Sequence, residues 1–366
     1  GESMPGTSRR RKIPRRVTLG VLALLLVLSG MLWARPIETH AKTLLLLAEV
    51  FPQAPVKPLS ALTDPPVHRK IRLGSQQGTI VADLFLPTPR SGHRGRHTTP
   101  AVMLAMGVKT KPRDKLLLLD FAQALSRLGY VVLWPRLQAL DKGISMLEPP
   151  DTFIVSFRYL KGLDSVAPYR IALMGISVGS SVAFVAAADP RINTDVRALI
   201  FFGGYHDIVD YLASLATGMS SFNNRTIEWH PSPEAIRHVR EILHAANARG
   251  VAQAVMAAAQ VRSLEEAEAL LRSAPERELV RLRHVSPSDH IDTFKARIFI
   301  LHDKGDDFVP YFESAKLNQD LPSKIERTYI MTDLFEHVQP ERGISLSTVH
   351  EFVRLYGFLY EVIGYL

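Results

Sequence analysis

A serine between two glycines is the residue of this sequence best suited to covalent chemistry. Ser177 lies between Gly175 and Gly179, after an apolar run that predicts a strand and at the start of a helical pattern that ends at Ala188. So tight a turn from strand to helix needs small residues on either side of the serine. It exposes the hydroxyl and points the first helical amides at a developing oxyanion. The pattern predicts a nucleophilic serine, and a serine that only caps the helix is the alternative.

A nucleophilic serine needs a base, and the base needs a carboxylate that orients it. A predicted strand over residues 298–301 leads into an acidic segment, and the carboxylate is expected on such a loop. Asp306 is the best candidate, with Asp303 and Asp307 as close competitors. Asp207, which follows an earlier predicted strand, is the next candidate.

The candidate base is a histidine that follows the last predicted strand. His337 comes shortly after the apolar stretch over residues 327–331. The chain order Ser177, Asp306, His337 is the order in which a Ser-Asp-His triad is met when each member follows a strand of one parallel sheet. A surface histidine without a catalytic role is the alternative for His337 alone.

The elements that must position these residues alternate between short apolar strands and amphipathic helices. This alternation predicts an α/β fold, with a mainly parallel central sheet covered by helices on both faces and an antiparallel pair at one edge. Strands are expected around residues 71–73 and over residues 78–86, 101–106, 129–135, 170–174, 196–202, 296–301 and 327–331. Helices are expected over residues 114–127, 151–162, 177–188 and 346–363.

One stretch, from about residue 207 to residue 289, interrupts the alternation. It contains helical patterns and no convincing strand, so we interpret it as a helical cap inserted into the sheet domain. Ser232 before Pro233 is typical of a helix start, and Ser263 has the spacing of a capping box. The uncharged run over residues 251–261 is interpreted as the core of the cap, with a lipid-binding wall as the alternative.

With these motifs in place, the chain from about Gly78 onward resembles the α/β-hydrolase superfamily, nearest in style to its dienelactone-hydrolase and acyl-esterase-like branches. Residues 78–87 resemble the second strand of that family, and residues 129–135 resemble the strand before its variable loop. Residues 306–310 resemble the family's D-x-x-V-P, which favours Asp306 over its neighbours. The resemblance implies hydrolysis of a carboxylic ester through an acyl-enzyme.

The sequence departs from the family after the third strand, where His-Gly is common. Met106 and Gly107 stand at that place. Because the oxyanion hole is built from backbone amides, loss of the histidine side chain need not abolish it. The expected donors are the amides of Val108 and Val178.

The N-terminal segment predicts membrane attachment. Residues 17–34 are apolar and uncharged, close to the ~20 residues that span a bilayer. The basic cluster in residues 1–16 predicts a cytoplasmic N-terminus, which places the domain over residues 67–366 outside the cytoplasm. Residues 35–66 are expected to be a proline-rich linker with a short helix over residues 43–50 near the membrane. A cleaved signal peptide is the alternative to the anchor.

Composition excludes several other classes of function. The sequence has no cysteine, so thiol catalysis and disulfides are excluded. No metal-binding or phosphate-cradling motif is present, so no metal and no cofactor are predicted. The net charge of +8 comes largely from the N-terminal cluster, so nucleic-acid binding is not expected.

Taken together, these patterns predict a membrane-anchored serine hydrolase that cleaves a small-molecule or lipid-like acyl ester. A peptidase or amidase on the same fold is one alternative. A catalytically inactive, membrane-tethered binding protein is the other. The sequence does not indicate an oligomeric state.

Overall fold

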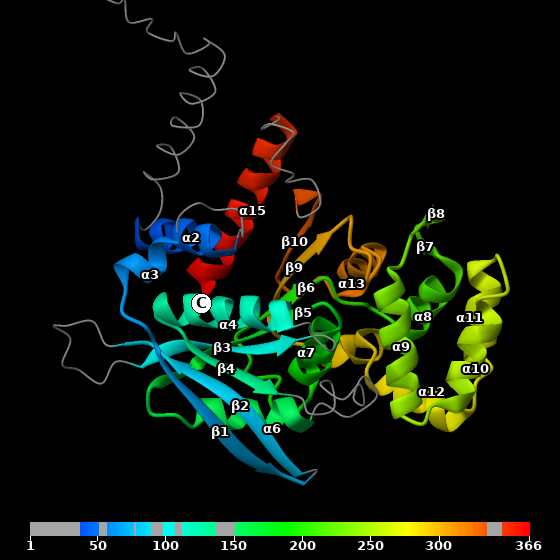
Figure 1. Cartoon of the computed structure of the whole chain (residues 1–366), viewed down its shortest axis with the longest axis horizontal. Coiled ribbons are helices and arrows are strands. Elements are labelled where there is room, and N and C mark those ends of the chain that lie inside the picture. The colour runs from blue at the N-terminus through cyan, green and yellow to red at the C-terminus, as the bar shows by residue number, and fades with distance from the viewer. Residues whose placement is uncertain are drawn as a thin grey trace, which may run out of the picture.

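A mixed sheet of eight strands forms the centre of the protein. The computed structural model describes residues 37–50, 57–76, 78–88, 98–106, 112–136, 151–334 and 346–366. The strand order is β1-β2-β4-β3-β5-β6-β9-β10 (Figure 1). The strands are β1 (Val67–Ser75), β2 (Gly78–Leu86), β3 (Thr99–Met106), β4 (Val131–Arg136), β5 (Val166–Ile176), β6 (Ala198–Phe202), β9 (Arg297–Asp303) and β10 (Arg327–Thr332).

The direction of the strands matches the prediction from the sequence. Strands β4, β3, β5, β6, β9 and β10 pair in parallel, whereas β1 and β2 form an antiparallel edge that joins β4. The central strands are buried on both faces, which explains why they read as continuous apolar runs. The carboxyl ends of the parallel strands therefore meet at one edge of the sheet.

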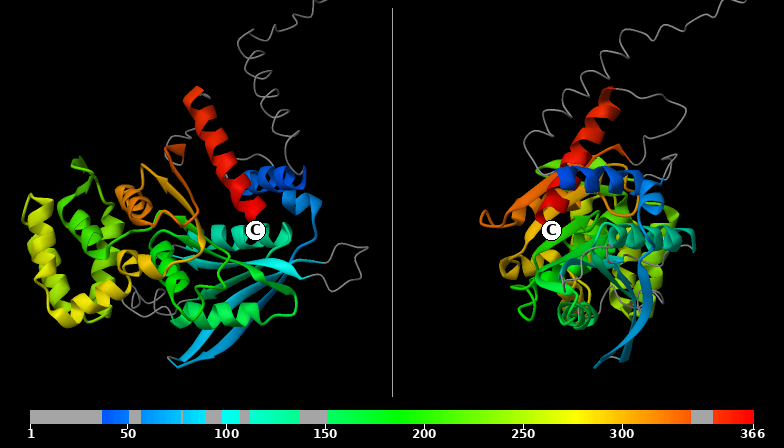
Figure 2. Two further views of the ribbon diagram at one scale, coloured as in Figure 1. Left: turned by 180° about the vertical axis from the view of Figure 1, so that it is seen from behind. Right: turned by 90° about the vertical axis from the view of Figure 1, so that its left-hand side faces the viewer.

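Helices cover both faces of this sheet. Helices α6 (Asp151–Lys161), α7 (Val178–Ala188) and α13 (Phe312–Asp320) contribute apolar side chains to one core, which includes Phe157, Phe184 and Leu317. Helices α4 (Pro112–Arg127) and α15 (Leu346–Tyr365) contribute to the core on the other face, which includes Leu125, Leu128 and Phe358. Figure 1 shows α4 above the strands and α6 below them, and the view from behind in Figure 2 shows the same arrangement.

The linker prediction for residues 35–66 differs from the structure. Helix α2 (Ile37–Val50) packs against α15, and helix α3 (Pro58–Leu62) follows it (Figure 1). Leu46 and Leu59 are buried in the same core as α15. The prolines were interpreted as marks of an extended segment, whereas Pro58 occupies the first turn of α3, where proline favours a helix start.

The predicted membrane span over residues 17–34 lies outside the described residues. Among the helices that the structure describes, none is both long enough and apolar enough to cross a bilayer.

The cap is a helical insertion between β6 and β9. Its helices stand to one side of the sheet (Figures 1 and 2) and enclose a core of their own, which includes Tyr211, Ile242 and Leu282. Both predicted helix starts are confirmed, because the Ser232 and Ser263 hydroxyls accept hydrogen bonds from first-turn amides. The helices are α8 (Ile208–Thr217), α9 (Pro233–Ala245), α10 (Arg249–Ala258), α11 (Leu264–Arg272) and α12 (Glu276–His284), followed by the 3-10 helix η1 (Pro287–Thr293).

The expectation that the insertion has no strand is wrong. Strands β7 (Met219–Phe222) and β8 (Arg225–Glu228) form an antiparallel hairpin in the cap. The two residues of its turn, Asn223 and Asn224, have φ of 48° and 60°. Asparagine tolerates this left-handed conformation and favours tight hairpin turns, so the Asn-Asn pair was the available signal.

The uncharged run over residues 251–261 contributes to the core of the cap, as interpreted from the sequence. Val251 and Ala258 are buried in that core, whereas Met256 on the same helix is 58% exposed. Helix α10 is therefore amphipathic, with its buried face turned toward the other cap helices.

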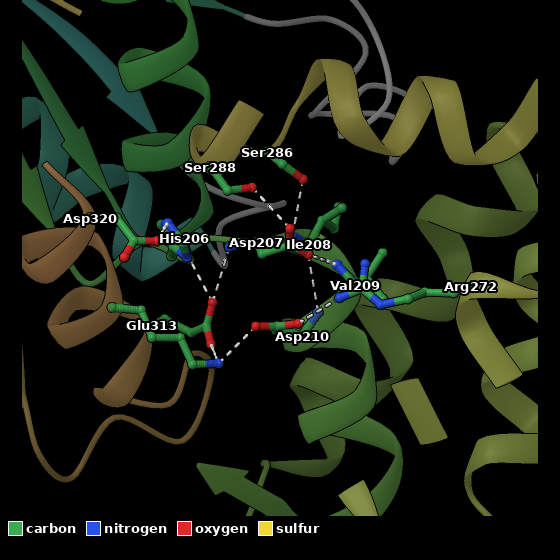
Figure 3. A network of polar contacts seen from close by, with 11 residues as sticks. His206, Asp207, Ile208, Val209, Asp210, Arg272, Ser286, Ser288, Glu313 and Asp320 are labelled. Atoms are coloured by element: carbon green, nitrogen blue, oxygen red, sulfur yellow. Dashed lines mark hydrogen bonds and ion pairs between the residues drawn. The ribbon is translucent and has the colours of Figure 1, made fainter. Parts of the chain in front are cut away.

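A network of charged side chains joins the cap to the sheet domain (Figure 3). Glu313 on α13 is fully buried, and its carboxylate accepts hydrogen bonds from the backbone amides of His206 and Asp207 at 3.0 and 3.2 Å. Lys316 Nζ lies 2.9 Å from both Glu313 Oε1 and Asp210 Oδ2, the latter on cap helix α8. Burial and the Glu313 charge raise the pKa of the Asp210 carboxyl. One ammonium group thus compensates two carboxylates across the junction.

Lys316→Met should destabilise the protein by about 3–5 kcal/mol at about pH 7, because Glu313 and Asp210 lose the cation that they share, and Asp210 keeps the longer contact with Arg272 at 3.3 Å. The folded-state pKa of Asp210, already raised, will rise further. The loss of unfolding free energy will be largest at pH values where the Asp210 carboxyl is ionised in the unfolded chain. This loss should shrink as pH falls toward about 5 and below. Urea unfolding of both proteins at several pH values measures this. The matched control is Lys324→Met at an exposed lysine, expected to stay within about 0.5 kcal/mol of wild type. A deficit that does not change with pH would contradict the prediction.

Candidate active site

Ser177 occupies a strained turn between β5 and α7. Its φ of 55° and ψ of −141° lie outside the regions that a serine ordinarily adopts, at a cost of about 1–3 kcal/mol. The Ser177 amide donates to the Phe202 carbonyl at 2.7 Å, and the Ser177 carbonyl accepts from the Ser180 amide at 2.8 Å. A capping serine would be extended and would accept a bond from a first-turn amide, yet the Ser177 side chain makes no such bond. The geometry favours a nucleophile over a helix cap.

The glycine before the serine is required by close packing of the backbone. A Cβ atom on Gly175 would lie 2.2 Å from Ser180 Cα and 2.7 Å from the Ser180 amide nitrogen. Because these are backbone atoms, no change of rotamer relieves the clash. The strand can therefore meet the helix at this angle only with glycine at position 175.

Asp306 is held rigidly in the loop after β9. Its Oδ1 accepts hydrogen bonds from the amides of Phe308 and Val309 at 2.8 and 3.0 Å. The other carboxylate oxygen lies 3.5 Å from His302 Nε2. It also faces Gly203, where a Cβ atom would come within 3.1 Å of it. One oxygen thus fixes the turn, and the other faces the end of β6.

The remaining aspartates have different surroundings. Asp303 accepts a hydrogen bond from the Gly305 amide at 2.8 Å. Asp207 caps α8 by accepting from the amides of Val209 and Asp210. Burial and the neighbouring Asp306 charge raise the pKa of the exposed Asp307 carboxyl. Of the four candidate aspartates, Asp306 is the one whose carboxylate faces the end of β6, the strand that pairs with β5.

Sheet topology brings Ser177 and Asp306 to the same edge of the sheet. Ser177 follows β5, Asp306 lies in the loop after β9, and β6 separates these two strands. Phe202, the last residue of β6, accepts the hydrogen bond from the Ser177 amide, and Gly203 beside it faces the Asp306 carboxylate. His337 would follow β10, the neighbour of β9, but it lies outside the described residues.

Of the two expected oxyanion donors, Val178 lies within the described residues. Val178 is the first residue of α7, so its amide lies among the helix N-terminal amides that have no acceptor within the helix. Val108 lies outside the described residues. The structure therefore places one of the two donors at the serine turn.

The loop that carries the acid is held between the sheet and the cap. Trp229 Nε1 donates to the Asp306 carbonyl at 2.8 Å, and the Ser232 amide donates to the Asp307 carbonyl at 2.9 Å. Val309 is fully buried in the core of the cap. The cap thus contributes directly to the position of Asp306.

His302 is a site residue that the sequence interpretation missed. It is fully buried at the end of β9, with Nδ1 2.6 Å from Ser314 Oγ and Nε2 3.0 Å from the Val309 carbonyl oxygen. Both groups near Nε2, the Val309 carbonyl and the Asp306 carboxylate, are acceptors, so Nε2 carries the proton and Nδ1 accepts from the Ser314 hydroxyl. The buried His302 imidazole therefore helps to hold the Asp306 carboxylate in place. Its position directly before Asp303 gave no signal by itself, because burial decides its role.

His302→Leu should lower kcat by roughly 10–100-fold with little change in KM, because it removes the donor beside Asp306 and loosens the carboxylate. His302→Gln places an amide donor near the position of Nε2 and should retain most of the activity. Steady-state kinetics of the two variants, with thermal unfolding as a check on folding, measures this. Equal activity of the two variants would show that His302 acts only through packing.

The part of the chain that the structure describes contains no group of three or more His, Asp or Glu side chains arranged to hold a metal ion.

Comparison with known proteins identifies the fold. No protein-family model and no curated protein matches the sequence. The structure is similar to that of the acylaminoacyl peptidase of Pyrococcus horikoshii, with 12% identity over 84% of this chain and a TM-score of 0.51. It is also similar to a puromycin-hydrolyzing peptidase of Mycobacterium tuberculosis, with 17% identity over 86% of this chain and a TM-score of 0.52.

The chain spans only 43% and 41% of the lengths of these two proteins, so the likeness concerns one part of each. The chain has the α/β-hydrolase fold.

Proposed function

We propose that the protein is a serine hydrolase with Ser177 as the nucleophile. The observation that carries the proposal is the strained backbone of Ser177, whose hydroxyl is not used as a helix cap. Strain of this kind persists where the surrounding structure holds it, and it is common at catalytic residues. The rigid placement of Asp306 one strand away supports the same assignment.

The proposed reaction is acyl transfer to water. Ser177 Oγ attacks the carbonyl carbon while His337 takes the hydroxyl proton, and the amides of Val108 and Val178 stabilise the oxyanion. His337 then protonates the leaving group, which departs and leaves an acyl-enzyme. Water, deprotonated by His337, releases the acid and restores Ser177. Asp306 orients His337 and stabilises its protonated form.

A carboxylic ester is the proposed substrate bond, and an amide or peptide bond is the second candidate. The ester follows from the sequence resemblance to esterase-like branches of the fold. The second candidate gains weight because both structural neighbours reported above are named as peptidases. A triad of this kind cleaves both bonds, so the substrate pocket decides between them.

Membrane attachment is part of the proposal. The apolar residues 17–34 would span the bilayer, with residues 1–16 in the cytoplasm and the domain on the other side. An enzyme held there would meet acyl substrates that partition into the bilayer.

Covalent labelling tests the proposal. A fluorophosphonate should modify the wild-type protein at Ser177, as located by mass spectrometry of the labelled peptide. A panel of p-nitrophenyl esters and aminoacyl p-nitroanilides then separates esterase from amidase activity. Failure of Ser177 to react, in a folded protein, would instead support a membrane-tethered binding protein without catalysis.

A further inference from the structure

Helix α2 exposes apolar side chains and buries polar ones. Ile37 is 73% exposed and Leu44 is 50% exposed, and Ala41 between them is also exposed. On the flank of the helix next to these residues, the polar residues His40 and Thr43 are buried. A helix that faces water shows the reverse arrangement, with polar residues outward.

The exposed residues form one continuous face. Ile37, Ala41 and Leu44 have the spacing i, i+4 and i+7, which places them on one side of the helix over about 10 Å. The nearby charges, Glu38 and Lys42, lie at the edge of this face and pair with each other at 2.8 Å. No charged residue stands within the face.

The orientation of α2 is fixed by the folded domain. His40 Nδ1 is hydrogen-bonded to the hydroxyl of Tyr356 on α15, and its ring lies 4.6 Å from that of Tyr360. Leu46 is buried in the core that α15 shares. Figures 1 and 2 show α2 lying beside α15 in each view. The domain thus holds the apolar face outward, so the exposure of this face is built into the fold.

The position of α2 in the chain indicates what covers this face. The apolar run over residues 17–34 ends three residues before Ile37, so a helix that follows a span begins at the bilayer surface. An in-plane helix buries its apolar face at the boundary of headgroups and acyl chains and leaves charges at its edge. Leu62, 71% exposed on the adjacent helix α3, adds apolar surface near the C-terminal end of α2.

We infer that the α2 face formed by Ile37, Ala41 and Leu44 lies on the lipid bilayer and sets the orientation of the domain above it. The inference rests on the proposed membrane attachment and adds a contact surface to it. The bilayer is the partner, and a second copy of the chain is the alternative that the test must exclude.

The lack of cysteine in the sequence allows a direct test with single-cysteine variants of the full chain. Ile37→Cys and Leu44→Cys, each labelled with bimane, are reconstituted in phosphatidylcholine–phosphatidylglycerol vesicles. Met256→Cys is the matched control, since Met256 is similarly exposed on a cap helix. A nitroxide-labelled lipid should quench the two α2 labels several-fold more than the control label, and aqueous iodide should quench the control label more.

Two results would overturn the inference. Labels on α2 that respond to iodide as the control does would show that the face meets water. Labels shielded from both quenchers would show that a second protein copy covers it. Flotation of the vesicles after an alkaline wash separately tests the anchor, and fluorophosphonate labelling of the same samples separately tests catalysis. If the chain floats with the vesicles while iodide quenches its α2 labels, the membrane anchor is supported and the contact between α2 and the bilayer is refuted.

Discussion

Ser177→Ala should lower kcat for an activated ester by on the order of 10⁶-fold, because it removes the atom that forms the acyl-enzyme. Fluorophosphonate labelling should disappear with it. The fold should persist, since the Ser177 hydroxyl makes no capping bond in α7. Turnover of p-nitrophenyl acetate by the purified variant, with circular dichroism as a check on folding, measures this. Activity near that of wild type would show that another residue is the nucleophile.

Ser177→Gly supplies the matched comparison for stability. Glycine adopts a φ of 55° without strain, whereas alanine retains the strain. After allowance for the greater freedom of glycine in the unfolded chain, Ser177→Gly should be more stable than Ser177→Ala by about 1 kcal/mol. Both variants should be inactive. Equal stability would indicate that the backbone at Ser177 relaxes in the variants.

Asp306→Asn should lower kcat by about 10⁴-fold, the effect known for loss of the orienting carboxylate in a serine protease triad. The asparagine oxygen can still accept from the amides of Phe308 and Val309, so the loop should keep its shape. What is lost is the negative charge that holds the correct histidine tautomer and stabilises its protonated form.

Asp303→Asn and Asp307→Asn are the controls for that loss. Asp303 accepts a hydrogen bond from the Gly305 amide in its own turn, and Asp307 is exposed, so each change should cost far less activity. Kinetics of the three variants on one ester gives the comparison. If Asp306→Asn is nearly silent while either control is severely impaired, the assignment of the acid is wrong.

The sequence predicted the parts of the fold that local chemistry determines. The strand–turn–helix around Ser177 followed from two glycines, and the clash calculated for Gly175 shows why glycine is needed. The parallel sheet followed from apolar runs that are buried on both faces. The choice of Asp306 as the candidate carboxylate rested on its loop after a predicted strand and on the resemblance of residues 306–310 to a family motif. Among the described aspartates, its contacts make it the best-placed candidate.

Features that depend on distant contacts were not predictable in the same way. The docking of α2 on α15 joins residues more than 300 positions apart, as in the bond between His40 and Tyr356. The role of His302 depends on its burial beside Ser314 and Asp306. Nothing in the local pattern of either segment encodes these partners, whereas the missed cap hairpin did have a local signal in its Asn-Asn turn.

The bonds from Trp229 and Ser232 to the acid loop bear on how this fold can be redesigned. Replacing the cap alone treats it as a separable module. Here the cap supplies donors to the carbonyls of Asp306 and Asp307, so a transplanted cap would have to bring equivalent donors. A chimera that replaced the cap without them would lose the bonds that hold the loop of Asp306 and Asp307. The smallest exchangeable unit in this protein is therefore the cap with its acid loop.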